Sequence, residues 1–137
     1  MANVAVIGLG KFGFHVAKQL DRLGHDVLAI DIDPANVQRI KDFSSRAVVL
    51  DALDKERLDA LGITDFETVV VSLGERIDAS ALITLHLKEI GIKHVVAKAG
   101  SEDHAKLLKL IGADEIIQPE CEVAEMLARR ISRKMED

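Results

Sequence analysis

Six short runs rich in β-branched and other apolar residues alternate with six stretches of helical periodicity along this chain of 137 residues. The runs are 3–7, 26–30, 46–50, 68–72, 94–97 and 115–117, and the helical stretches are 11–23, 34–43, 55–61, 77–90, 102–110 and 120–134. Runs that are apolar at most positions are typical of parallel strands covered by helices on both faces. We therefore predict an α/β fold with a doubly wound, six-stranded parallel sheet of order 3-2-1-4-5-6.

The residues between these segments agree with the predicted boundaries. Gly24, Gly62, Gly91 and Gly112 each follow a helical stretch, where a left-handed residue commonly ends a helix. No linker or low-complexity segment interrupts the pattern, so we predict a single domain over residues 1–137.

A glycine motif, Gly8-x-Gly10-x-x-Gly13, follows the first strand and opens the first helix. This context is the one that a dinucleotide-binding Rossmann fold requires. Gly8 permits the tight turn, Gly10 lets a pyrophosphate approach the backbone, and Gly13 lets the helix pack on the strand. With Lys11 and Phe12, these glycines are our candidate phosphate-binding residues.

Acidic residues follow the second and third strands. Asp31 ends the second strand 18 positions after Gly13, where a carboxylate accepts hydrogen bonds from ribose hydroxyls. A 2′-phosphate there would be repelled by about 1 kcal/mol in water and about 4 kcal/mol at an effective dielectric of 20, which disfavours NADP. Asp31 as a simple strand cap is the alternative. Asp33 is either the N-cap of the second helix, before Pro34, or a ribose or adenine contact. Asp51, beside Ala52, is either an adenine-side residue or a loop acid.

The composition disfavours several other classes of protein. The net charge is −5, from 23 acidic and 18 basic residues, so we expect no nucleic-acid binding. No apolar run approaches about 20 residues, so we expect no membrane insertion. The single cysteine fits a cytoplasmic location. The five histidines show no metal-ligand spacing, and we expect them to be surface or packing residues. No catalytic dyad is evident, so we predict a site that binds without chemistry and a protein that is not an enzyme.

The motifs together resemble the RCK/KTN (TrkA-N) domain, and most closely the Ktr-type regulatory subunit of potassium uptake systems. The matching segments are VAVIGLGKFG at 4–13, LAIDID at 28–33, VVLDA at 48–52, FETVVVSLG at 66–74, VVAKA at 95–99 and IGAD at 111–114, followed by QPE at 118–120. The resemblance covers essentially the whole chain.

This resemblance implies a cytoplasmic sensor of NAD(H), ATP or ADP that regulates a potassium channel or a Trk/Ktr-type uptake system. Homodimers would assemble into an octameric ring beneath a membrane-embedded potassium-translocating subunit, at the inner face of the cell membrane. It implies that Lys98 faces the nucleotide, the alternative being a solvent lysine. It also implies that Glu120 helps to bind a divalent cation or Na⁺ between subunits, the alternative being a helix-capping acid.

Three features qualify the resemblance. Leu50 precedes Asp51 where family members usually have glycine, and Lys11 stands where Ktr-type members often have arginine. The chain ends after one Rossmann domain, which indicates either a single-domain member or a truncated sequence.

The last helix, from about residue 120, carries an apolar stripe of Val123, Met126, Leu127 and Ile131. This stripe packs on the sheet in a monomer or crosses to a partner in a dimer, and we favour the dimer.

Two other functions remain open. The chain is alternatively the cofactor-binding domain of a small NAD-dependent oxidoreductase, or an NAD-binding redox sensor that controls transcription.

Overall fold

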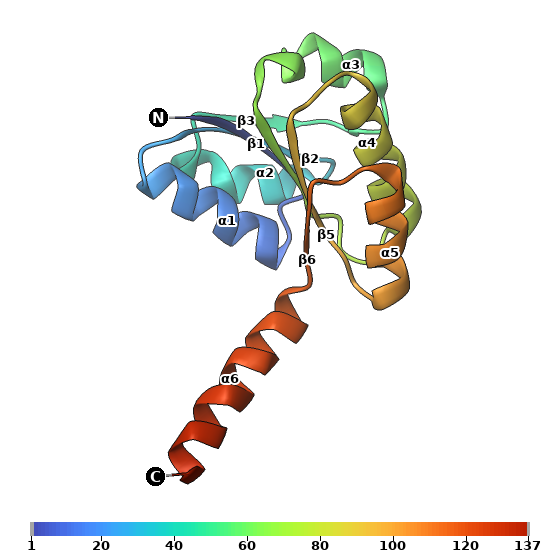
Figure 1. The fold of residues 1–137 in the computed structure, drawn as a ribbon. Coiled ribbons are helices and arrows are strands. Elements are labelled where there is room, and N and C mark those ends of the chain that lie inside the picture. Colours follow the sequence, from blue (N-terminus) through green and yellow to red (C-terminus); the bar gives the residue numbers. More distant parts are fainter. Residues whose placement is uncertain (1, 137) are drawn as a thin grey trace.

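All six strands lie in one parallel sheet of order β3-β2-β1-β4-β5-β6 in the computed structural model, which describes residues 2–136 (Figure 1). This order confirms the predicted doubly wound topology. The strands are β1 (Asn3–Ile7), β2 (Asp26–Asp31), β3 (Arg46–Val49), β4 (Thr68–Val71), β5 (His94–Lys98) and β6 (Glu115–Ile117). Each boundary lies within one residue of its predicted position.

The helices also follow the prediction closely. They are α1 (Lys11–Arg22), α2 (Pro34–Ile40), α3 (Lys55–Ala60), α4 (Ile77–Glu89), α5 (Glu102–Ile111) and α6 (Pro119–Glu136), with short 3₁₀ turns at Lys41–Phe43 and Ile63–Asp65. The predicted helix over 34–43 is therefore shorter, since its last turn tightens into the 3₁₀ form that is frequent at helix ends. Gly24, Gly62, Gly91 and Gly112 all have positive φ, as predicted.

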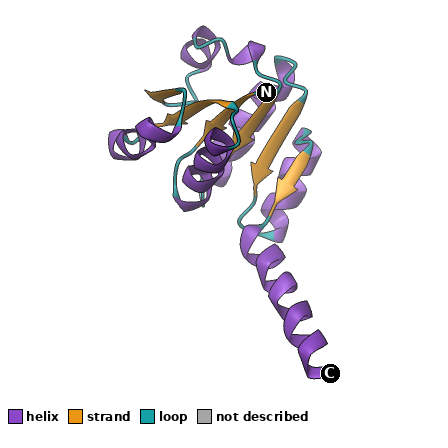
Figure 2. Cartoon of the chain, turned by 90° about the vertical axis from the view of Figure 1, so that its left-hand side faces the viewer, coloured by secondary structure: helices purple, strands orange, loops and turns teal. Residues whose placement is uncertain are grey.

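Helices cover both faces of the sheet and enclose two apolar cores (Figures 1 and 2). Helices α1 and α2 pack on one face, where Ala17 and Ile40 meet Val6 and Ala29 of the central strands. Helices α3, α4 and α5 pack on the other face of the sheet. There Ala5 and Ile7 of β1 share a core with helix residues that include Leu58, Ile83, Leu87 and Leu108. Burial on both faces explains why β1 is apolar at four consecutive positions.

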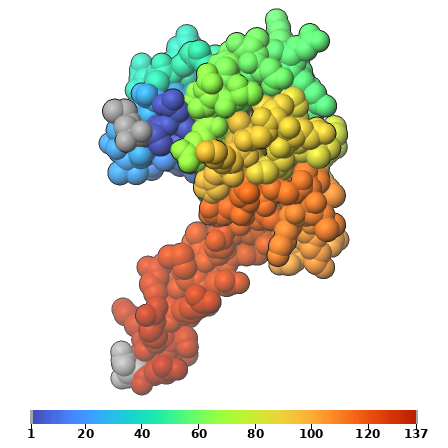
Figure 3. All heavy atoms as spheres, turned by 45° about the horizontal axis from the view of Figure 1, so that its top comes forward, coloured from blue at the N-terminus to red at the C-terminus, as the bar shows by residue number. Residues whose placement is uncertain are grey.

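Helix α6 leaves this body and projects away from it (Figures 1 and 3). None of its described residues is buried. Val123, Met126, Leu127 and Ile131 are 58%, 57%, 48% and 51% exposed, so the interpretation in which this stripe packs on the chain's own sheet is wrong. Among residues 2–136, no helix combines the length and the apolar character that crossing a bilayer requires.

Candidate functional site

The glycine loop joins β1 to α1 at the point where the sheet order reverses, next to β4. Gly8 has φ of +96°, and its N–H donates a 2.8 Å hydrogen bond to the carbonyl of Ile30. A Cβ on Gly8 would lie 1.9 Å from the carbonyl oxygen of Ser72, and one on Gly13 would lie 1.8 Å from the carbonyl oxygen of Gly8. Both glycines are therefore required by close backbone packing, as their positions in the motif predict.

Gly10 differs from the other two glycines because it faces open space. A Cβ added there would meet no other group within 4 Å. Gly10 is the N-cap residue of α1, and no acidic residue lies in the first turn of this helix. Unpaired N–H groups and the helix dipole favour an anion at such an end. The exposed Lys11, the first residue of the helix, adds a positive charge. The geometry therefore fits a phosphate group held against the loop.

Asp31 links the end of β2 to the glycine loop. Its Oδ2 accepts a 2.7 Å hydrogen bond from the N–H of Leu9, and its Oδ1 accepts one of 2.8 Å from the N–H of Asp33. The carboxylate thus lies beside the glycine loop. The interpretation as a ribose acceptor is compatible with this position, but Asp31 also has a structural role that the sequence did not reveal.

The other two predicted acids, Asp33 and Asp51, each accept a hydrogen bond from a backbone N–H two residues further along the chain, at the same edge of the sheet. The Asp33 carboxylate accepts a 2.9 Å bond from the N–H of Ala35, so Asp33 is the N-cap of α2, one of its two predicted roles. Oδ1 of Asp51 accepts a 3.0 Å bond from the N–H of Leu53. Ala52, which follows Asp51, is buried.

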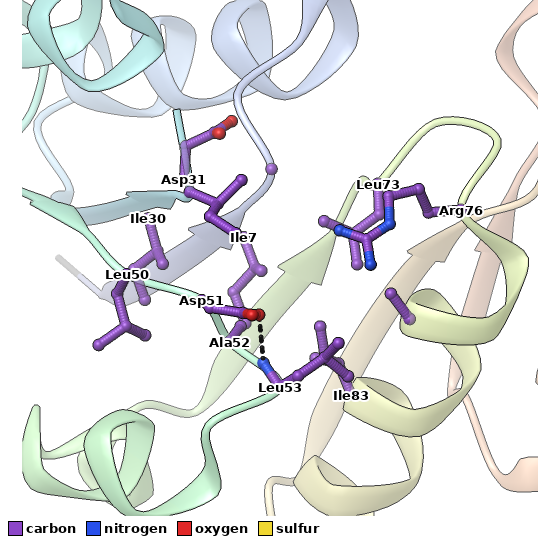
Figure 4. Close-up of a pocket in the computed structure, with 13 residues that line it drawn as sticks. Ile7, Ile30, Asp31, Leu50, Asp51, Ala52, Leu53, Leu73, Arg76 and Ile83 are labelled. Atoms are coloured by element: carbon purple, nitrogen blue, oxygen red, sulfur yellow. Dashed lines mark hydrogen bonds between the residues drawn. The ribbon is translucent and has the colours of Figure 1, made fainter. Parts of the chain in front are cut away.

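A hollow lies between the carboxyl ends of β1, β2 and β3 and the start of α4 (Figure 4). The hollow is small and partly open to solvent. Its lining is mostly apolar, with Ile7, Ile30, Leu50, Ala52, Leu73 and Ile83 among the residues. Asp31 and Asp51 also line it. An apolar lining with a few polar groups is typical of a small-molecule site.

Two polar residues near this site were not predicted from the sequence. Arg76, which precedes α4, also lines the hollow, and Figure 4 shows its guanidinium directed into it. Asn36, on α2, donates from Nδ2 to Oδ2 of Asp31 over 3.2 Å. Neither belongs to a motif. The available signals were an arginine just after the loop that follows a strand and an amide five residues after the acid.

Lys98 and Glu120 lie in a second groove, which they line together with Gly74, Glu75 and Cys121. The Lys98 ammonium lies 5.8 Å from the centre of the Phe12 ring, within the range of a cation–π contact. This contact connects the groove to the glycine loop. Glu120 and Glu122 are both acids of the first turn of α6. Oε2 of Glu122 accepts a 2.8 Å hydrogen bond from the N–H of Gln118. Within residues 2–136, no three His, Cys, Asp or Glu side chains are grouped as a metal site.

A buried histidine supports the loop after β5. His104 is 2% exposed; its Nδ1 accepts a 3.1 Å bond from the N–H of Gly100, and its Nε2 lies 3.2 Å from the hydroxyl of Ser80. Burial lowers the pKa of His104 below its ordinary value. His86 is also buried, with Nε2 2.9 Å from Oδ1 of Asp59. Both are packing residues, as the sequence predicted.

Comparison with known proteins agrees with this fold. The family model of the TrkA-N domain matches residues 4–119, and the chain therefore belongs to the TrkA-N family. The chain is 44% identical over 128 residues to the Ktr system potassium uptake protein A of Bacillus subtilis, an alignment that covers 93% of this chain and 58% of that protein. The chain thus spans somewhat more than half the length of this relative.

Solved structures share the fold at low sequence identity. The NAD(P)-binding domain of an exopolyphosphatase-related protein from Archaeoglobus fulgidus superposes with a TM-score of 0.82 at 19% identity, over 97% of this chain and 99% of that one. The Kef C-terminal domain of Shewanella denitrificans in its AMP-bound form gives a TM-score of 0.82 at 21% identity, over 98% of this chain and 82% of that one. At these identities the likeness establishes the Rossmann-type fold.

Proposed function

We propose that this chain is the nucleotide-binding part of a regulatory subunit of a Ktr-type potassium uptake system. The observation that carries the proposal is the position of Gly10 and Asp31, which bring an open helix end and a carboxylate to the same edge of the sheet. The 44% identity to a Ktr potassium uptake protein supports the assignment to this type of transport system. Membership of the TrkA-N family supports the same assignment.

The proposed ligand is an adenine nucleotide, either NAD(H) or ATP and ADP. Gly8, Gly10 and Gly13 would hold its phosphates, and Asp31 would hold its ribose. The apolar hollow beyond Asp31 would take the base, with Asp51 and Arg76 at its polar side. The two solved structures, one an NAD(P)-binding domain and the other a domain in an AMP-bound form, support this class of ligand.

The proposed output of binding is a change of shape and not a reaction. Lys98 connects to the phosphate loop through Phe12 and shares its groove with Glu120, at the start of α6. A phosphate chain that extends from Gly10 toward Lys98 would therefore reach the base of α6. Ligands of different phosphate length would then bias the position of this helix, as a regulator requires.

The proposed assembly is a homodimer formed through α6, which assembles further into an octameric ring beneath the membrane-embedded potassium-translocating subunit. The exposed stripe on α6 supports the dimer, because a free helix rarely leaves four large apolar side chains about half exposed. The protein would then be cytoplasmic and peripheral at the inner face of the membrane. Glu120 would contribute to a divalent cation or Na⁺ site only if the partner subunit adds further oxygen ligands.

The nucleotide that accompanies the purified protein tests the proposal directly. We expect mass spectrometry of a heat-denatured sample to reveal NAD(H), ATP or ADP. Calorimetry should then measure saturable binding of at least one of them. Failure of all three to bind would overturn the nucleotide assignment.

A second experiment separates a regulator from an oxidoreductase. The gene that contains this chain should restore potassium-limited growth to bacteria that lack their own Ktr regulatory subunit, and the Asp31→Ala variant should not. Sustained hydride transfer from NADH to small carbonyl compounds by the purified chain would instead favour the oxidoreductase.

A further inference from the structure

The carboxylate of Asp31 is largely occupied by donors from the protein itself. Oδ2 accepts from the N–H of Leu9 at 2.7 Å and from Nδ2 of Asn36 at 3.2 Å. Oδ1 accepts from the N–H of Asp33 at 2.8 Å. A carboxylate offers about four acceptor positions, two on each oxygen. Oδ2 is therefore filled, and one acceptor position remains on Oδ1.

The amide of Asn36 is held in the orientation that fills Oδ2. The guanidinium of Arg39, three residues further along α2, donates to Oδ1 of Asn36. A guanidinium only donates and a carboxylate only accepts, so Asn36 must turn its oxygen to Arg39 and its NH₂ group to Asp31. The reverse orientation would bring two donors together at Arg39 and two acceptors together at Asp31. Arg39 thus fixes the donor that Asn36 presents.

We infer that Asn36 restricts Asp31 to one ribose hydroxyl, whereas a free carboxylate in this position would accept from both. The inference rests on the proposed nucleotide site and concerns how that site reads the sugar. Two adjacent hydroxyls bind a carboxylate together when each oxygen offers a free acceptor position. Here only Oδ1 does, because Leu9 and Asn36 take both positions of Oδ2. Asn36 is therefore a positioning residue for the ribose, and one sugar hydroxyl should contribute nothing through Asp31.

Deoxynucleotides test this inference on the unmodified chain. Calorimetry should compare ADP with 2′-deoxy-ADP and 3′-deoxy-ADP. A hydrogen bond to a charged acceptor corresponds to about a 10- to 150-fold change in affinity. We expect one of the two analogues to bind at least tenfold more weakly than ADP, and the other to bind within about twofold of it.

The Asn36→Ala variant tests the cause of this asymmetry. Removal of the amide frees a position on Oδ2, so the analogue that the unmodified chain tolerates should now bind at least threefold more weakly than ADP. Gln38→Ala is the matched control, since Gln38 is exposed on the same helix. Its ratio of affinities should equal that of the unmodified chain.

The possible outcomes separate this inference from the proposed function. Equal losses for both analogues on the unmodified chain, or no loss for either, would overturn the inference and leave the nucleotide site intact. An unchanged asymmetry in Asn36→Ala would show that Asn36 is not its cause and would also overturn it. If ADP, ATP and NADH all fail to bind the unmodified chain, the proposed function fails and the inference fails with it.

Discussion

The N–H of Leu9 lies 2.7 Å from Oδ2 of Asp31, so the loop after β1 is bonded to the acid that ends β2. The two residues are 22 positions apart in the sequence. The acid that we assign to the ribose therefore also fixes the loop that we assign to the phosphates. A change at Asp31 should consequently affect both halves of a nucleotide.

Replacing Asp31 by alanine tests the candidate site. We expect the affinity for ADP to fall at least tenfold, because a charged hydrogen bond of about 1.5–3 kcal/mol to the ligand disappears and the loop loses its anchor. Calorimetry measures the affinity, and Asp42→Ala, at an exposed acid outside the site, is the control. An unchanged affinity for ADP, ATP and NADH would show that the site lies elsewhere.

The glycines of the loop should separate folding from binding. Gly13→Ala places a Cβ 1.8 Å from the Gly8 carbonyl oxygen, and we expect the free energy of unfolding to fall by about 1–3 kcal/mol or more. Gly10→Ala meets no group within 4 Å and should cost less than about 1 kcal/mol. Its methyl group would occupy the space that we assign to a phosphate, so nucleotide binding should be lost. Urea denaturation and calorimetry give the two quantities, and tight binding by Gly10→Ala would contradict the assignment.

Lys11 should distinguish nucleotides by the length of their phosphate chain. The side chain is exposed, and an exposed charge pair contributes up to about 1 kcal/mol. We therefore expect Lys11→Ala to lower the ratio of ATP affinity to AMP affinity about two- to fivefold, and Lys11→Arg to preserve it. Lys41→Ala, at another exposed lysine, is the control. Equal effects on ATP and AMP would assign Lys11 to the fold and not to the terminal phosphates.

The sequence predicted the fold more completely than the site, for a physical reason. Strand boundaries follow from burial, which a run such as Val4 to Ile7 displays directly in its residue types. The glycine motif was recognisable because steric limits restrict Gly8 and Gly13 to one residue type. Asn36 and Arg76 act through the directions of their side chains, which tertiary packing sets and local spacing does not. The departure of α6 from the sheet was also undetermined, since its apolar stripe suits either packing surface.

The buried His104 should make the stability of the fold depend on pH. Its pKa is lowered in the folded protein, so the unfolded chain binds a proton more readily than the folded one. The stabilisation is complete above the ordinary histidine pKa and decreases as the pH falls through the folded pKa. A proton on Nδ1 would also face the N–H of Gly100. We therefore expect the urea midpoint of the unmodified chain to decrease when the pH is lowered from 8 to 5.5. The decrease should be smaller in His104→Gln, and His15→Gln is the control. Identical pH profiles would exclude this origin.

The apolar stripe of α6 should hold two copies of the chain together. Leu127 is 48% exposed and central to the stripe, so Leu127→Glu would place a charge in the proposed interface, which is costly without a partner. We expect the dissociation constant of the dimer to rise at least tenfold, measured by light scattering across a dilution series. Ser132→Glu makes the same change of charge on the opposite side of the helix, at 3.6 residues per turn, and should leave the dimer intact. Since α6 makes no buried contact with its own body, both variants should keep the thermal stability of the monomer. A chain that is monomeric before any substitution, or a dimer that tolerates Leu127→Glu, would exclude α6 as the interface.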